Sequence, residues 1–201
     1  VDEGMLVYTE ATGGVRTEEH KATPSGQRLR GVPIVVLINE GSASASEIVS
    51  GAIRHYADIG KLKALLVGQR SYGKGSVQNV LELSSSTRMK LTTQYYFLPN
   101  GQLIHRREGA SSWGVQPHIA IEMLPKQISD ALTLRQEADT PLAFLNPDQE
   151  QPAGAGQPDP DRLLTEGMDL QLEGALFLLQ SQALDKIKTK VVQAANTPKA
   201  D

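Results

Sequence analysis

Residues 34–47 read IVVLINEGSASASE, a short apolar run that leads directly into a serine-rich turn. The run at 34–38 is rich in β-branched residues and is followed by a glycine-containing turn, which predicts a buried strand. Apolar residues then recur at helical spacing from Ile48 to Tyr56, with Gly60 as the expected stop. Because a second apolar run follows at 64–67, the region is predicted to be β-α-β with parallel strands.

A polar turn follows each of the two predicted strands. Ser42, Ser44 and Ser46 come after the first strand, and Gly73-Lys74-Gly75 comes after the second. In open α/β sheets, ligands and catalytic residues collect at the carboxyl ends of the strands. This edge is therefore where we expect the chemistry of the protein.

The rest of the chain is predicted to form a core followed by helical extensions. We expect the core at 1–123, a helical extension at 124–145, a Pro/Gly-rich linker at 146–161 and a long helix at 162–195. The long helix is expected to pack on the core, with self-association through it as the alternative.

Apolar alternation predicts further strands in the core. They lie at 4–9, 77–83, 88–97 and 118–121. The turn Pro99-Asn100-Gly101 is expected to return 102–105 as a hairpin partner of 88–97. The polar residues 11–29 are expected to form a surface excursion.

Composition excludes some classes of function. The net charge of −3, without a basic run, argues against a nucleic-acid-binding protein. The absence of cysteine excludes disulfides and thiolate chemistry. The chain begins at Val1 without a signal peptide and resembles a piece of a longer protein, so it carries no information on export.

The serine turn has two interpretations. Ser44 and Glu47 fit the capping box S-x-x-E, in which each side chain binds the other residue's amide. Alternatively, a serine in the first turn of a helix is exposed above the sheet, where unpaired helical amides can stabilise an oxyanion. The sequence pattern leaves both open.

A nucleophilic serine needs a base, and Lys74 is the better candidate than any histidine. His55 is eleven residues beyond Ser44 on the same predicted helix, too far to reach it. Serine–lysine pairs are a known variant of serine hydrolysis, provided that the fold keeps the amine neutral. If the strand extends from Lys74, Gln78 lies on the same side and could hydrogen-bond the amine.

A rival interpretation is a phosphate-binding loop. Residues 68–74 match G-x-x-x-x-G-K after a strand. However, Gly75 stands where Ser or Thr should hold magnesium, and the following residues alternate like a strand rather than opening a helix. This interpretation is disfavoured.

Two motifs in order, NEGSASASE at 39–47 and SYGKGSVQ at 71–78, carry a specific resemblance. Together with 91–97, 99–101 and 114–117, they resemble the carboxyl-terminal processing (tail-specific) proteases of peptidase family S41. The resemblance covers about 115 residues, from near Met5 to Ile121.

The resemblance implies an α/β fold with a ClpP/crotonase-like β-α-β core and a β-hairpin, followed by C-terminal helices. It implies a serine endopeptidase that cleaves proteins near the C-terminus. In that family Ser44 would be the nucleophile, Lys74 the general base, Gln78 the residue that positions the lysine, and the Ala45 amide one oxyanion-hole donor. No cofactor or metal is implied.

The resemblance also implies partners and a location. The partners would be protein or peptide substrates, unfolded or with exposed C-termini, and not nucleic acid. The location would be exported, periplasmic or in the cell envelope.

The sequence departs from the family pattern in several respects. Ser44 and Lys74 are 30 residues apart, a longer spacing than usual, with the extra length expected at 55–63. His118 stands where the family usually has an acidic residue. The family's glycine-rich oxyanion turn and PDZ domain are not matched, so the chain resembles the C-terminal part of such a protease. The alternative is a non-catalytic binding or assembly fragment.

Overall fold

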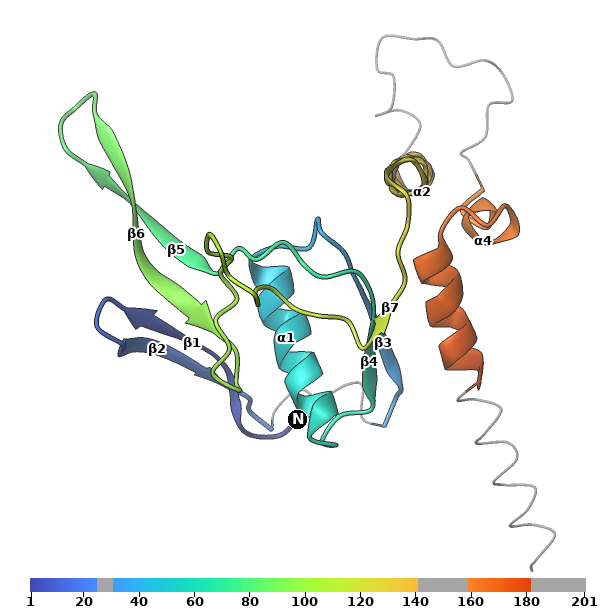
Figure 1. Cartoon of the computed structure of the whole chain (residues 1–201), viewed down its shortest axis with the longest axis horizontal. Helices are drawn as coiled ribbons and strands as arrows, with labels where there is room; N and C mark the ends of the chain where they lie inside the picture. Colours follow the sequence, from blue (N-terminus) through green and yellow to red (C-terminus); the bar gives the residue numbers. More distant parts are fainter. Residues whose placement is uncertain (25–30, 141–158, 182–201) are drawn as a thin grey trace, which may run out of the picture. The chain divides into compact units, whose positions relative to one another are not determined.

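The computed structural model describes residues 1–24, 31–140 and 159–181 (Figure 1). They form two compact units, Val1–Ala120 and the described residues from Ile121 onward. The division lies three residues before the boundary expected after residue 123. Each unit has its own hydrophobic core.

The first unit contains the predicted β-α-β region. Its elements are β3 (Ile34–Ile38), α1 (Ala45–Asp58) and β4 (Ala64–Gly68), and β7 (Ile119–Ala120) completes a parallel sheet of order β3-β4-β7. Strands, helix and turns fall where the apolar pattern predicts them, which confirms the α/β class. Both polar turns lie at the carboxyl ends of β3 and β4.

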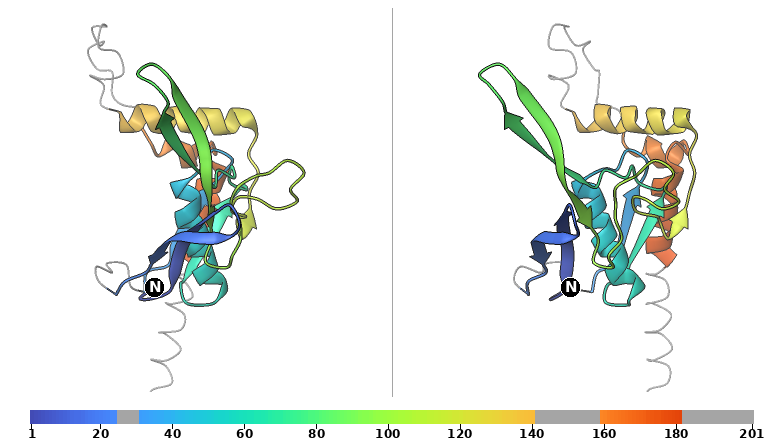
Figure 2. Two further views of the ribbon diagram at one scale, coloured as in Figure 1. Left: turned by 90° about the vertical axis from the view of Figure 1, so that its left-hand side faces the viewer. Right: turned by 60° about the vertical axis from the view of Figure 1, so that its left-hand side comes forward.

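The core of the first unit lies under α1. Ile38 and Leu66 from the parallel sheet pack with Leu98, Ile104 and Val115, all almost fully buried. The helix contacts β4 on one side and β1 on another (Figure 2). This packing fixes the start of α1 next to the end of β3.

A second, antiparallel sheet completes the first unit. It consists of β1 (Met5–Ala11), β2 (Val15–Lys21), β5 (Ser76–Glu82) and β6 (Arg88–Phe97), in the order β2-β1-β6-β5. The strands β5 and β6 form a long hairpin that projects from the unit (Figure 1).

Two predictions for this sheet were wrong. Residues 15–21 form β2 instead of a surface excursion; the strand is exposed at every position and therefore carries no apolar alternation. The expected return at 102–105 is not a strand but a single bridge between Phe97 and Leu103. Instead, β6 pairs with β5 from Arg88 to Tyr95 and with β1 from Gln94 to Phe97.

The described residues of the second unit form helices. The predicted helix at 126–138 is present as α2 (Pro125–Asp139), and α4 (Arg162–Thr165) follows. A small core of Met123, Ala131, Leu134 and Leu163 joins them. No helix of the described residues is long and apolar enough to span a membrane.

The prediction of a continuous helix from residue 162 onward is wrong for the first part of that range. The helix α4 ends at Thr165, Gly167 beyond it has φ of 60°, and helix resumes at 170–181. The Asp169 carboxylate accepts a hydrogen bond from the Leu172 amide at 2.9 Å, as an N-cap does. Residues 182–195 of the expected helix and 146–158 of the expected linker lie outside the described residues, so self-association stays a prediction.

Candidate active site

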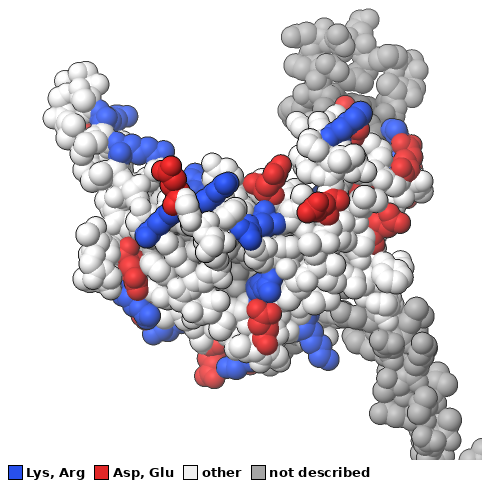
Figure 3. Space-filling model, viewed as in Figure 1, with Lys and Arg blue, Asp and Glu red and all other residues white. Residues whose placement is uncertain are grey.

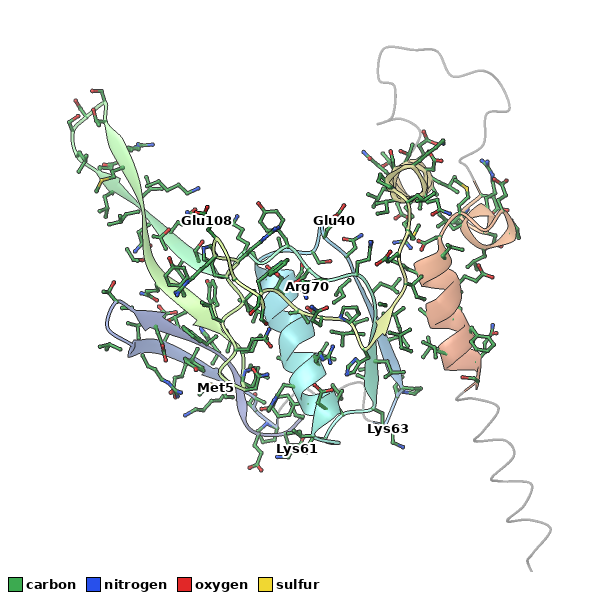
Figure 4. The ribbon with its side chains drawn as sticks, viewed as in Figure 1. Met5, Glu40, Lys61, Lys63, Arg70 and Glu108 are labelled. Atoms are coloured by element: carbon green, nitrogen blue, oxygen red, sulfur yellow. The ribbon has the colours of Figure 1, made fainter. Side chains whose placement is uncertain are left out.

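The serine turn places Ser44 in a strained backbone conformation immediately before α1. Its φ and ψ are 58° and −118°. Within the described residues, Ser44 is the only non-glycine residue with positive φ. Such conformations cost on the order of 1–3 kcal/mol and cluster at functional sites. Figure 4 shows the neighbouring Glu40 at this end of the unit, with Lys61 and Lys63 at the opposite end.

The lysine turn follows β4 and is shaped by close packing of its two glycines. A Cβ atom on Gly73 would lie 2.7 Å from Trp113 Cδ1, and one on Gly75 would lie 2.6 Å from the His105 amide. The glycines therefore hold the turn against the 104–113 segment rather than merely leaving it free to bend. The Lys74 side chain is exposed, so the described residues do not bury it.

Glu47 connects the two turns. Its side chain is fully buried, and each carboxylate oxygen accepts two hydrogen bonds. Oε2 accepts from the amides of Ser44 and Lys74 at 3.0 and 2.7 Å. Oε1 accepts from the Gly73 amide and the Ser71 hydroxyl at 2.6 and 2.5 Å. Four donors thus compensate the burial of this carboxyl group, and no ion pair among the described residues includes it.

This connection brings the two predicted turns to a common point. Ser44 and Lys74 are 30 residues apart in sequence, yet their amides bind the same carboxylate oxygen. The bond to Ser44 is one arm of the predicted capping box. The three donors from the lysine turn were missed, because no local sequence pattern links Glu47 to residues 71–74.

Gln78 lies near the start of β5, but its contacts differ from those expected. Its side-chain amide donates to the Thr92 hydroxyl at 3.4 Å, and across the described part of the chain no hydrogen bond joins it to Lys74. A register shift between Val77 and Gln78 breaks the alternation on which the expectation depended. The role of Gln78 stays a prediction.

Ala45 is the first residue of α1 and is exposed. Its amide is one of the first four of the helix, which have no acceptor within the helix. It can therefore donate to a group bound above Ser44. The oxyanion role stays a prediction.

His105 packs beside the lysine turn. Its ring lies 5.0 Å from that of Tyr95, and its buried Nδ1 has no hydrogen-bond partner within the described residues. Burial lowers its pKa, as does the charge of Arg107, while Glu47 opposes the shift. These effects favour the neutral form of His105.

His118 has a structural role. Its Nδ1 accepts from the Leu66 amide at 2.8 Å, and its Nε2 lies 2.9 Å from the Asp58 carboxylate. The ring thus joins β4, the segment before β7 and the end of α1. None of the four histidines hydrogen-bonds Ser44 in the parts of the chain described here, which for His55 agrees with its expected distance along the helix.

Comparison with known proteins assigns the family. The sequence model of "Peptidase family S41" matches residues 1–121, more than half of the chain. The chain belongs to peptidase family S41. This confirms the family resemblance carried by the two turn motifs.

Named relatives agree with this assignment. The chain is 42% identical over 96 residues to a carboxy-terminal-processing protease of Bartonella bacilliformis, a match that covers 47% of this chain and 20% of the relative. It is 33% identical over 120 residues to a carboxyl-terminal-processing protease of Synechocystis sp., covering 60% of this chain and 25% of the relative. This S41 chain therefore spans about a fifth to a quarter of the length of these relatives.

Solved structures are also similar. One of them is the photosystem II D1 C-terminal processing protease, with 30% identity and a TM-score of 0.48, covering 64% of this chain and 31% of that one.

Proposed function

We propose that this chain carries the catalytic serine and lysine of a serine endopeptidase that cleaves proteins near the C-terminus. Ser44 is the nucleophile, Lys74 the general base, Gln78 the residue that positions the lysine, and the Ala45 amide an oxyanion donor. Its substrates are unfolded proteins or peptides with exposed C-termini. By its family, the protein is exported to the periplasm or cell envelope.

The observation that carries the proposal is the strained Ser44 held to the lysine turn through Glu47. A purely capping serine needs no positive φ, because capping residues normally adopt extended backbone conformations. The value of 58° turns Ser44 sharply at the end of a strand, as the nucleophile elbow of other serine hydrolases does. The shared carboxylate oxygen keeps this turn next to Lys74.

The reaction follows from these roles. Neutral Lys74 takes the proton of the Ser44 hydroxyl, whose oxygen attacks the peptide carbonyl, and the oxyanion faces the Ala45 amide. The lysine then gives its proton to the leaving amine, and water hydrolyses the acyl-enzyme. Because Lys74 is exposed here, the bound substrate must exclude water from its amine for the base to act.

The test is cleavage of an unfolded protein by the complete protein that carries this chain. Ser44→Ala and Lys74→Ala should each lower turnover by about 10³-fold or more. The matched controls are Ser46→Ala, in the same turn, and Lys63→Ala, at the opposite end of the unit (Figure 4). Full activity of folded Ser44→Ala would exclude this nucleophile.

A non-catalytic assembly role is the second candidate. One face of the β5–β6 hairpin presents Leu81, Met89 and Leu91, which are 42%, 39% and 45% exposed. Exposed apolar strips of this kind are typical of interaction surfaces. If the folded wild-type protein cleaves no unfolded protein, this candidate replaces the protease.

A further inference from the structure

Two arginines pack on Trp113 beside the lysine turn. The guanidinium carbons of Arg70 and Arg106 lie 4.1 and 4.5 Å from the centroid of the Trp113 ring. The two charges are therefore within about 9 Å of each other, where like charges repel unless an anion lies near them. The contacts with the ring stabilise each guanidinium and limit its movement. We call Arg70 and Arg106 the arginine pair.

Arg106 of the arginine pair is hydrogen-bonded to the residue that precedes Lys74. The Arg106 amide donates to the Gly73 carbonyl at 2.9 Å. Trp113 and the Arg106 Cβ occupy the space that a side chain on Gly73 would need. The pair therefore has a fixed position beside the candidate catalytic lysine.

The arginine pair has no carboxylate partner in the described parts of the chain. Arg16, Arg54 and Arg88 each form ion pairs with Asp or Glu. In contrast, the Arg70 guanidinium faces the neutral side-chain amide of Gln116, and among the described residues no ion pair joins the Arg106 guanidinium, which packs on Trp113, to a carboxylate.

Acidic residues are nevertheless present at this end of the unit. Figure 4 shows Glu40 and Glu108 at the same end as Arg70, and neither forms an ion pair with Arg70 or Arg106 in the described structure. Figure 3 shows basic side chains gathered here with acidic ones among them. Among the described residues, the arginine pair next to the lysine turn thus has no ion-paired carboxylate.

We infer that the arginine pair is a substrate subsite for a carboxylate that lies close to the scissile bond. The inference rests on the proposed protease function. Guanidinium groups bind carboxylates through two parallel hydrogen bonds, and groups that are already fixed lose little entropy on binding. The carboxylate is either an Asp or Glu side chain of the substrate or its terminal carboxylate.

The test uses four quenched fluorescent peptides of equal length. They carry Glu or Gln beside the cleaved bond, each with a free or an amidated C-terminus. For the complete wild-type protein we expect kcat/KM to be about tenfold higher for the peptide with the recognised carboxylate than for its neutral counterpart. A higher kcat/KM for Glu than for Gln peptides identifies the side chain as the source of that carboxylate. A higher kcat/KM for free than for amidated C-termini identifies the terminal carboxylate.

Arg106→Gln should reduce the ratio of kcat/KM between the recognised carboxylate peptide and its neutral counterpart to near one. Arg88→Gln, on the β5–β6 hairpin, should leave this ratio unchanged. Each ratio is measured within one variant, so a partly unfolded preparation does not alter it. If the wild-type protein cleaves all four peptides equally, or if Arg106→Gln keeps the wild-type ratio of kcat/KM, the subsite is refuted. The proposed protease function is unaffected by either result.

Binding to the Ser44→Ala protein, followed by fluorescence anisotropy, separates the two proposals. The subsite is supported if the Ser44→Ala protein binds the carboxylate peptide more tightly than the neutral one and the Ser44→Ala/Arg106→Gln protein does not. This holds even if the wild-type protein cleaves nothing. Equal binding of all four peptides together with no cleavage refutes both.

Discussion

Replacing Glu47 with glutamine tests whether one buried carboxylate holds the serine and lysine turns together. The native side chain accepts four hydrogen bonds, two on each oxygen. Glutamine keeps the shape but offers one acceptor oxygen and one NH2 donor. Its best orientation keeps the oxygen opposite the amides of Ser44 and Lys74 and turns the NH2 toward the Ser71 hydroxyl. The Gly73 amide then faces a donor and is left unpaired.

The expected loss of stability follows from this count of hydrogen bonds. A buried donor without a partner costs about 1–3 kcal/mol. The two bonds that remain lose the strengthening of a charged acceptor, on the order of 0.5–1 kcal/mol each. Relief of the buried charge offsets part of the sum. We expect Glu47→Gln to lower the free energy of unfolding by about 2–4 kcal/mol.

Urea unfolding at pH 7 measures this loss, with Glu40→Gln as the matched control. Glu40 is exposed and is close to the same turn, so its replacement should change stability by less than about 0.5 kcal/mol. In the variant, amide hydrogen exchange at Gly73 should accelerate more than the global loss explains. If Glu47→Gln unfolds like the control, the carboxylate does not hold the turns, and the argument from shared hydrogen bonds is wrong.

Two histidines give further predictions. His118→Ala should lower the free energy of unfolding by about 1–3 kcal/mol, because the fully buried Leu66 loses the acceptor of its amide; a change within about 0.5 kcal/mol in urea unfolding would contradict this role. For His105, the lowered pKa in the fold means that the unfolded chain binds the proton first as the pH falls below about 6.5. Stability should therefore decline from that pH toward the lower folded pKa and be unaffected above it. His105→Phe should make the fall in urea midpoint between pH 7.5 and 5.5 smaller than in wild type, and an equal fall in both proteins would exclude this cause.

The elements that the sequence predicts well are those with a buried face. The strands β3 and β4 and the helix α1 between them have apolar residues at the spacing that burial requires. β2 was missed because none of its residues is buried, so that only its pairing with β1 makes it a strand. The break near Gly167 was missed because the leucine pattern continues across it, while the capping role of Asp169 depends on the break itself.

In the candidate site, too, the sequence predicts local elements but not the contacts between distant ones. The serine and lysine turns were predictable, because each follows a recognisable strand. Their connection through Glu47 was not, since a capping box explains the glutamate locally and leaves its other oxygen unassigned. For the same reason the arginine pair had no sequence signal: its members are 36 positions apart and meet on a tryptophan from a third segment.

The long spacing between Ser44 and Lys74 also has a physical explanation. The segment between them includes the end of α1 at Asp58 and the connection to β4. The relation between the two turns is set at their own ends, by parallel pairing of β3 with β4 and by the Glu47 carboxylate. Extra residues at the far end of the helix therefore lengthen the crossover without moving either turn. A shift of Glu47 along α1 by one position, in contrast, would rotate its carboxylate by about 100° and release both turns while leaving the spacing unchanged.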